Sequence, residues 1–264
     1  MLLHGYPQTH VIWHKVAPVL AEHFTVVAPD MRGYGDSGKP PCGEGGVNYA
    51  KRVMAADQVR VMAALGHDSF HLAGHDRGGR VAYRLTLDHP EKVRKLALLD
   101  IVPTLEQFET MGKSGSFGSF HWYLLAQPAP FPEELIGRDP DFFCRHMIDS
   151  ICGTPGAITD AAMAAYLEAF RNPDTIRATC DDYRAGYGID CDIDAADRDA
   201  GRRIDCPLLA MWGARGRPHK AQGVIGTWQK WATDMRGKGL DCGHFLPEEA
   251  PMETAGELHA FFSG

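Results

Sequence analysis

A short glycine-rich stretch at residues 74–78 (Gly-His-Asp-Arg-Gly) constrains the fold of this chain more than any other feature. It lies between residues 69–73, which predict a short strand, and residues 78–87, which have helical spacing of apolar residues. Small residues around a central side chain permit the sharp strand-to-helix turn of a nucleophile elbow. Here the central residue is Asp76. Because Asp and Gly are also common in ordinary turns and helix caps, the stretch alone favours neither interpretation.

The composition is that of a globular protein rather than a nucleic-acid-binding or membrane protein. The chain has 264 residues, 44% of them hydrophobic, so it can bury a core as one domain or as one domain with a large insertion. Its formal net charge of -7 gives no basic surface for nucleic acid, and no apolar run predicts a membrane span. The seven cysteines lie far apart and form no C-x-x-C pair, so they suggest neither a zinc site nor a disulfide framework and fit reduced thiols in a cytoplasm. We expect no metal and no cofactor.

Strands and helices alternate in the first and last parts of the chain. This alternation predicts an α/β fold with a mostly parallel sheet covered by helices on both faces. We assign residues 1–103 and 204–264 to this core. Besides the elbow, the expected strands are 24–28, 93–99, 207–213 and 235–241, and the expected helices are 13–23, 51–65 and 251–262.

Residues 104–203 break this alternation and predict a helical cap inserted into the core. The pattern indicates helices at 133–137, 139–152 and 160–170, with irregular stretches between them and no convincing strand. At the start of the chain, the apolar residues 1–3 run directly into a turn, as the end of a strand would. The beginning of that strand is absent from the sequence.

Three polar residues follow expected strands: Asp76 in the elbow, Asp100 after the next strand and His244 after the last. In an open parallel sheet, ligands bind beyond the carboxyl ends of the strands, so we expect these side chains to converge. A single His or Asp after a strand is more often an ordinary loop residue. However, the other position for a triad acid, in the turn at 214–217, holds no carboxylate, which favours Asp100 as the partner of His244.

An aspartate at the elbow predicts a different chemistry from a serine. A carboxylate with an ordinary pKa of about 3.9 is ionised at neutral pH, so Asp76 can displace a leaving group from carbon without a base. His244, oriented by Asp100, would then activate water to hydrolyse the resulting ester. The backbone N–H groups of Tyr6 and Arg77 are placed to stabilise the oxyanion. Suitable leaving groups are a halide or an epoxide oxygen.

Two arginines, Arg77 and Arg80, lie three residues apart at the positive end of the expected helix. Most arginines are solvated surface residues, but one directly after a buried nucleophile borders the pocket. An anionic substrate beside Asp76 meets a repulsion of about 4 kcal/mol at a separation of about 4 Å and an effective dielectric of about 20, which two arginines offset. The pair predicts a small carboxylate substrate with its leaving group on the neighbouring carbon.

Several motifs resemble those of the haloacetate dehalogenases, including fluoroacetate dehalogenase, of the α/β-hydrolase fold. The likeness covers nearly the whole chain, in HGYPQTH at 4–10, GHDRGGR at 74–80, LDI at 99–101, HW at 121–122, AQPAP at 126–130, DYRAG at 182–186 and GHFLP at 243–247. The resemblance implies Asp76 as nucleophile, His244 as base, Asp100 as its partner, and Arg77 with Arg80 as a carboxylate clamp.

The same resemblance implies a halide pocket formed by His121, Trp122 and Tyr183 of the cap. Their N–H and O–H groups can stabilise the charge on a departing halide, although aromatic residues in a helical insertion usually fill its core. Tyr187 is a nearby alternative to Tyr183. The chain departs from some relatives at Ile151, where an aromatic residue is expected, and this leaves the width of the pocket and the preferred halide open.

The main hypothesis is a haloacetate dehalogenase that converts fluoroacetate or chloroacetate into glycolate and halide through an ester on Asp76. An epoxide hydrolase uses the same Asp-Asp-His set with acidic cap tyrosines, but Arg77 beside the nucleophile argues against it. An ester hydrolase is disfavoured because Asp replaces Ser. The resemblance also implies edge strands of the sheet before His4, which we expect to be missing here through a late start assignment or a truncation. A non-catalytic carboxylate-binding protein is the alternative if their absence abolishes the site. We expect no nucleic-acid or membrane partner. The sequence leaves the oligomeric state open, with a homodimer as one alternative.

Overall fold

A five-stranded sheet forms the centre of the protein in a computed structural model that describes residues 1–215 and 220–264. All neighbouring strands are parallel and follow one another in chain order, so the predicted fold class is confirmed. Residues 216 and 217, part of the turn without a carboxylate, lie outside the described residues. The strands are β1 (Leu2–Leu3), β2 (Phe70–His75), β3 (Val93–Leu99), β4 (Leu208–Gly213) and β5 (Met235–Leu240).

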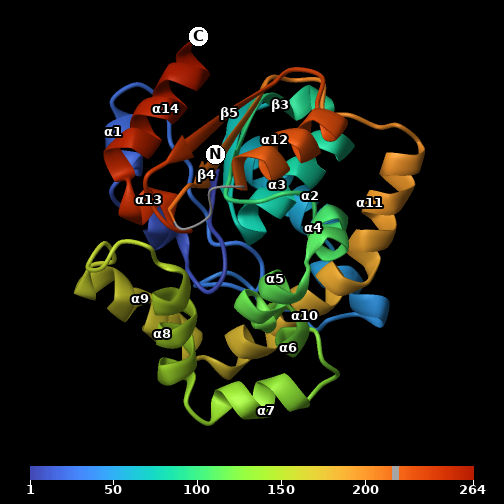
Figure 1. Cartoon of the computed structure of the whole chain (residues 1–264), viewed down its shortest axis with the longest axis vertical. Coiled ribbons are helices and arrows are strands. Elements are labelled where there is room, and N and C mark those ends of the chain that lie inside the picture. The colour runs from blue at the N-terminus through green and yellow to red at the C-terminus, as the bar shows by residue number, and fades with distance from the viewer. Residues whose placement is uncertain (216–219) are drawn as a thin grey trace.

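Helices cover both faces of the sheet (Figure 1). One face carries α2 (Lys51–Ala64), α3 (Arg77–Asp88) and α12 (Lys220–Trp231), and the other carries α1 (Ala17–Ala21) and α14 (Pro251–Ser263). Because the sheet is covered twice, its central strands are apolar runs without polar alternation, and every residue of β4 is buried. This burial fixes the carboxyl ends of the strands, where the polar residues of interest lie.

Two predicted elements near the start of the chain are wrong. The expected strand at 24–28 is irregular and only partly buried, because it receives one hydrogen bond from β1, from the Leu2 N–H to the Val27 carbonyl at 2.8 Å, and no described strand pairs with its other side. The expected helix at 13–23 is a 3-10 turn (His10–Trp13) followed by α1. Pro18 explains this break, since proline is tolerated in the first turn of a helix but not in its interior.

Every regular element described between β3 and β4 is a helix, and we call residues 104–203 the helical region. The sequence predicts α7, α8 and α9 and misses the other five. No helix in the described part of the chain has both the length and the apolar character needed to cross a membrane. The helices are α4 (Thr104–Thr110), α5 (Lys113–Gly118), α6 (Phe120–Leu125), α7 (Phe131–Gly137), α8 (Pro140–Ile151), α9 (Asp160–Phe170), α10 (Pro173–Tyr187) and α11 (Ile189–Asp199).

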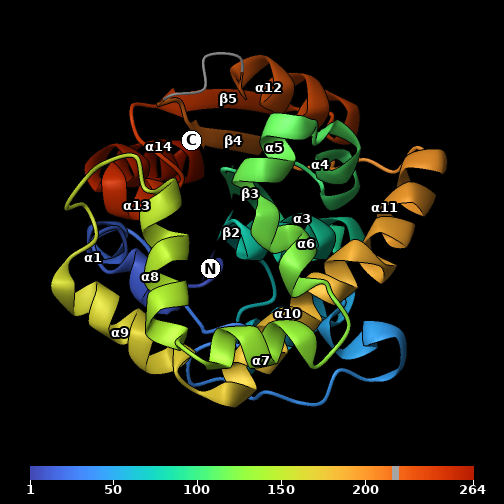
Figure 2. The same ribbon diagram turned by 60° about the horizontal axis from the view of Figure 1, so that its bottom comes forward.

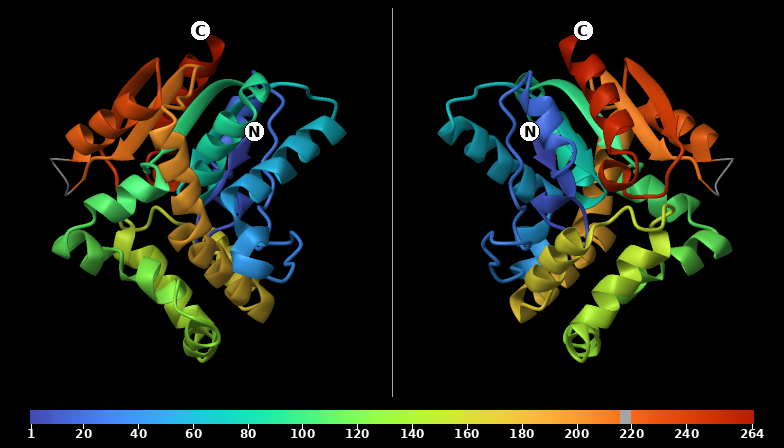
Figure 3. Two further views of the ribbon diagram at one scale, coloured as in Figure 1. Left: turned by 90° about the vertical axis from the view of Figure 1, so that its right-hand side faces the viewer. Right: turned by 90° about the vertical axis from the view of Figure 1, so that its left-hand side faces the viewer.

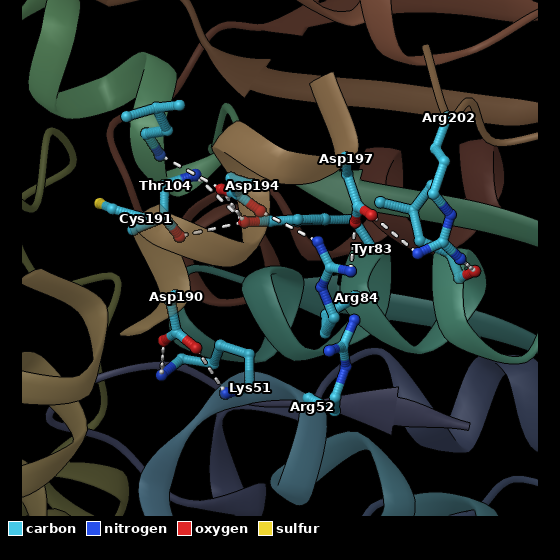
Figure 4. A network of polar contacts seen from close by, with 12 residues as sticks. Lys51, Arg52, Tyr83, Arg84, Thr104, Asp190, Cys191, Asp194, Asp197 and Arg202 are labelled. Carbon is cyan, nitrogen blue, oxygen red and sulfur yellow. Dashed lines mark hydrogen bonds and ion pairs between the residues drawn. The ribbon is translucent and has the colours of Figure 1, made fainter. Parts of the chain in front are cut away.

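The helical region lies at one end of the sheet, as Figures 2 and 3 show from two directions. Its last helix, α11, returns along the core and is held there by charged contacts (Figure 4). Three buried aspartates at helical spacing meet core cations: Asp190 pairs with Lys51 at 3.1 Å, and Asp194 and Asp197 both pair with Arg84. Ion pairs as well as apolar contacts therefore connect the helical region to α2 and α3.

Candidate active site

The turn between β2 and α3 holds Asp76 in a strained conformation that its glycine neighbours permit. Asp76 has φ 46° and ψ −119°, and a positive φ is uncommon outside glycine. A Cβ atom at Gly74 would lie 2.5 Å from the Gly78 carbonyl oxygen, and one at Gly78 would lie 2.3 Å from the His4 carbonyl oxygen. The chain can therefore make this tight turn only with glycine at both positions, as in a nucleophile elbow.

The loop after β1 binds the Asp76 carboxylate directly. The backbone N–H of Tyr6 donates to Asp76 Oδ2 at 2.9 Å. A Cβ atom on Gly5 would lie 2.5 Å from Asp76 Cβ, so the close approach of this loop requires glycine. His4 fixes the loop, because its Nε2 accepts the Met31 N–H at 3.0 Å and its Nδ1 therefore donates to the Gly5 carbonyl.

Asp100 and His244 meet at the carboxyl ends of β3 and β5. Asp100 Oδ2 lies 2.7 Å from His244 Nδ1, and its Oδ1 accepts the Gly213 N–H at 2.9 Å. The His244 carbonyl oxygen accepts a hydrogen bond from His75 Nε2 at 2.8 Å. These contacts hold the imidazole with Nδ1 toward the carboxylate.

A small pocket of about 110 Å³ connects these groups with the helical region. This volume is far below that of a site for a drug-sized ligand, so the pocket suits a molecule of a few heavy atoms. Of the predicted site residues, Arg77 and Tyr183 are not among those that line it, and the other seven are. The lining residues are Tyr6, Pro7, Asp76, Arg80, Asp100, Gln107, Gly118, Ser119, His121, Trp122, Met147, Ile151 and His244.

Arg77 lies behind the pocket and is held by Asp182, a residue that the sequence interpretation did not assign to the site. Its Nε and Nη2 atoms both donate to the Asp182 carboxylate at 2.9 Å. Lys51 and Tyr34 also bind this carboxylate, whose pKa is strongly lowered because the charges of Arg77 and Lys51 outweigh the opposing effect of burial. The DYRAG motif contained Asp182, but nothing local marked Lys51 as its partner.

Arg80 is the arginine that lines the pocket. Its Nη1 donates to the Val102 carbonyl at 2.9 Å and to Thr104 at 3.2 Å, while its Nε has no protein partner among the described residues. Its guanidinium carbon lies 4.4 Å from the centre of the Trp122 ring. Burial and the neighbouring charge of Arg77 lower the pKa of Arg80, so an anionic ligand would stabilise its charged form.

The three aromatic residues of the helical region pack around Tyr183, which also contacts Tyr6, the residue whose N–H binds Asp76. The ring centres of Tyr183 and Tyr6 are 5.2 Å apart, and those of Tyr183 and His121 are 5.7 Å apart. Within the described chain, the Tyr183 hydroxyl and His121 Nδ1 are buried without a hydrogen-bond partner. Tyr187 is 60% exposed, whereas Tyr183 is 2% exposed, so Tyr183 is the tyrosine of the pair that lies at the site.

The charges around these groups favour an ionised Asp76 and neutral donors. Burial opposes the ionisation of Asp76, but the charges of His244, His75 and the two arginines outweigh it and lower its pKa. Burial lowers the pKa of His121 to about 4, against an opposing effect of Asp76. Burial and then the Asp76 charge raise the pKa of Tyr183 well above its usual range. The site can therefore combine an anionic nucleophile with uncharged N–H and O–H donors.

Comparison with known proteins identifies the family. A model of the alpha/beta hydrolase fold matches residues 1–251. A fluoroacetate dehalogenase from Burkholderia sp is 42% identical over 265 residues, covering 100% of this chain and 86% of the relative. A soluble epoxide hydrolase from Corynebacterium sp. (strain C12) is 32% identical over 267 residues, covering 100% of this chain and 89% of the relative.

A solved structure agrees with these sequences. A Nostoc sp PCC 7120 protein assigned to the alpha/beta hydrolases superposes with a TM-score of 0.95 at 49% identity, covering 98% of this chain and 89% of the other. The chain belongs to the alpha/beta hydrolase family and is a hydrolase; within that family it belongs with the haloacetate dehalogenases, as its motifs imply. An epoxide hydrolase is also similar, so these similarities alone do not separate the two reactions.

Proposed function

We propose that this hydrolase removes halide from haloacetates such as fluoroacetate and chloroacetate and yields glycolate. One observation carries the proposal: an aspartate occupies the elbow of a pocket of about 110 Å³ that Arg80 lines. An ionised carboxylate attacks carbon, and a buried guanidinium binds a small carboxylate substrate. The similarity to a Burkholderia sp fluoroacetate dehalogenase supports the same reaction.

In the first step, Asp76 forms the ester. Because the Tyr6 N–H holds Oδ2, we assign Oδ1 as the attacking oxygen. Oδ1 forms a bond to the substrate CH₂ carbon while the carbon–halogen bond breaks and the halide leaves with the electron pair. We assign the stabilisation of the departing halide to the N–H and O–H donors of His121, Trp122 and Tyr183, whose rings contact one another.

In the second step, water hydrolyses this ester. His244, oriented by Asp100, takes a proton from water, and the hydroxide attacks the carbonyl carbon of Asp76. The Tyr6 N–H stabilises the oxyanion on Oδ2. The bond between the carbonyl carbon and the glycolate oxygen then breaks, His244 returns the proton to that oxygen, and Asp76 loses its own proton to solvent. The overall reaction consumes one water and releases glycolate, halide and one proton.

Epoxide hydrolysis is the second candidate, because the Tyr183 hydroxyl is buried without a partner in the described chain and a Corynebacterium sp. epoxide hydrolase is similar. A protonated tyrosine can donate to an epoxide oxygen as the ring opens. Arg80 separates the two candidates, since a neutral epoxide has no carboxylate to bind it. A variant with Arg80→Leu should lose haloacetate turnover under the first candidate and keep epoxide turnover under the second.

The direct test is halide release from fluoroacetate, chloroacetate and bromoacetate by the purified protein, with Asp76→Asn as the matched control. We expect the wild type to release halide and the control to release none above background, because an amide oxygen is a poor nucleophile. Diol formation from an epoxide by folded protein that releases no halide would replace this proposal with the second candidate. Carboxylate binding without any turnover would indicate a binding protein.

A further inference from the structure

One carboxylate, that of Glu249, ties the loop carrying His244 to the helical region. Gly243 and Phe245, on either side of His244, donate their backbone N–H groups to Glu249 at 2.7 and 2.9 Å. Glu249 Oε2 also accepts the N–H of Gly153, just after α8, at 2.9 Å, although the two residues are 96 positions apart. Both oxygens of this side chain, at the end of α13 (Leu246–Glu249), are therefore used to hold backbone.

The two segments that Glu249 joins touch backbone to backbone. A Cβ atom on Gly243 would lie 2.3 Å from the Gly153 nitrogen, so both positions suit glycine. The direct bond between the segments, from the His244 N–H to the Ile151 carbonyl, is long at 3.3 Å. The shorter, charge-assisted bonds to Glu249 are the stronger ties. Because Ile151 lines the pocket, this junction also sets one part of the pocket wall.

We propose that Glu249 is a positioning residue for ester hydrolysis, holding the loop that carries His244 in one geometry. This inference rests on the proposed function. Glu249 touches none of the reacting atoms, and it acts through the backbone on both sides of His244. Glutamine has a similar shape but only one acceptor oxygen, and its NH₂ group would face backbone donors. The change would leave at least one N–H unsatisfied and release the loop.

The two-step mechanism makes this role measurable. His244 acts only after the ester on Asp76 has formed, so a displaced imidazole slows hydrolysis and leaves the first halide release unchanged. Displacement of a catalytic group by about 1 Å can reduce a rate by about 100-fold. We therefore expect Glu249→Gln to lower steady-state halide release by about 10- to 100-fold. General damage to the fold would slow both steps together.

The experiment follows chloroacetate turnover by rapid quench, measuring halide and, by intact mass, the fraction of protein that carries the ester. We expect Glu249→Gln to release a first halide at the wild-type rate and then to accumulate ester. Glu248→Gln is the matched control: Glu248 is a buried neighbour that binds Tyr166 and Lys15 rather than the His244 loop. It should not change the ester fraction. If Glu249→Gln does not fold, Glu249→Asp, which keeps the charge but retracts it by one CH₂ group, should show a smaller ester accumulation.

Two results would overturn the proposal in different ways. An unchanged ester fraction in a folded Glu249 variant, or an equal loss in the first and second steps, would remove the role of Glu249 while wild-type turnover left the proposed function intact. Absence of halide release from the wild type would remove the proposed function itself, and with it the hydrolysis step that Glu249 is proposed to assist.

Discussion

The pocket has two walls that differ in how their polar atoms are satisfied. On the core wall, the side chains of Asp76, Asp100 and His244 bind backbone or one another. On the wall from the helical region, His121 Nδ1 has no partner among the described residues, and neither has the hydroxyl of Tyr183, whose ring packs against His121. A buried donor without a partner costs about 1–3 kcal/mol, which an anionic ligand would recover. The core wall is thus organised before a ligand binds, and the helical wall offers donors to it.

The largest effect should come from the core wall, with Asp100→Asn. The amide removes the anionic acceptor of His244 Nδ1, and ester hydrolysis should fall roughly 10³- to 10⁴-fold. The first halide release should persist, so intact mass should show the ester accumulating. If the first halide release slowed as much as steady-state turnover, the role of Asp100 would not be confined to ester hydrolysis, and the two walls could not be assigned to separate steps.

The next largest effect should be on stability, with Asp182→Asn behind the helical wall. The change leaves Arg77 and Lys51 buried with less negative charge beside them, and removing one partner of a buried ion pair costs about 3–5 kcal/mol. Urea unfolding should show this loss. The matched control is Asp181→Asn, one residue earlier, whose partners Arg177 and Arg184 are partly exposed, and which should cost about 1 kcal/mol or less. Equal losses would mean that the buried ion pairs of Asp182 stabilise the protein no more than the partly exposed ion pairs of Asp181.

A smaller effect should separate halide departure from hydrolysis, with Tyr183→Phe. Loss of one donor to the leaving halide should slow the first release by about 10- to 100-fold, and more for fluoride than for bromide because fluoride accepts stronger hydrogen bonds. No ester should accumulate, in contrast to Asp100→Asn. Tyr187→Phe, at an exposed position on the same helix, should leave both steps unchanged. Ester accumulation in Tyr183→Phe would mean that Tyr183 assists ester hydrolysis rather than halide departure.

The smallest effect concerns the stability between pH 6.5 and 4, through His75, whose ring lies beside that of His244, and His121 in the helical region. Burial, assisted by the charge of His244, lowers the pKa of His75 to about 4, and burial lowers that of His121 to about 4. The unfolded chain therefore binds more protons than the folded protein in this window. As the pH is lowered, the free energy of unfolding should decrease by up to about 1.4 kcal/mol per pH unit for each histidine. Urea unfolding should show the slope, to which His4, His71 and the Met1 amino group also contribute because their pKa values are lowered by burial. His121→Asn should remove its own share, up to about 1.4 kcal/mol per pH unit. An unchanged slope would mean that His121 does not titrate as its burial implies.

The local part of the site could be predicted from sequence because its constraints are local. The elbow needs small residues within a few positions of Asp76, and the glycine contacts at Gly74 and Gly78 show the same requirement in space. Asp100 and His244 follow strands of a parallel sheet, whose carboxyl ends meet at one edge. The assignments made from these patterns needed no knowledge of partners far along the chain.

The parts that sequence missed depend on distant partners. Asp182 becomes part of the site because Arg77 and Lys51, 105 and 131 residues earlier, bind its carboxylate. α10 was missed because its buried face includes Thr179, Asp181 and Asp182, so it lacks an apolar stripe, although Asn172 caps its start. The segment at 24–28 has the composition of a buried strand, but a strand also needs hydrogen bonds to neighbouring strands, and the composition of the segment does not reveal these.

The charged face of α11 has a consequence for exchanging parts between related enzymes. Asp190, Asp194 and Asp197 meet Lys51 and Arg84 in one register, and sliding the helix by one turn would leave buried charges unpaired. Apolar contacts tolerate small shifts of a helix along its axis, whereas each such shift of α11 would separate buried ion pairs. A chimera that takes residues 104–203 from a relative should therefore assemble correctly only if α2 and α3 come from that relative too, or if both cations are kept.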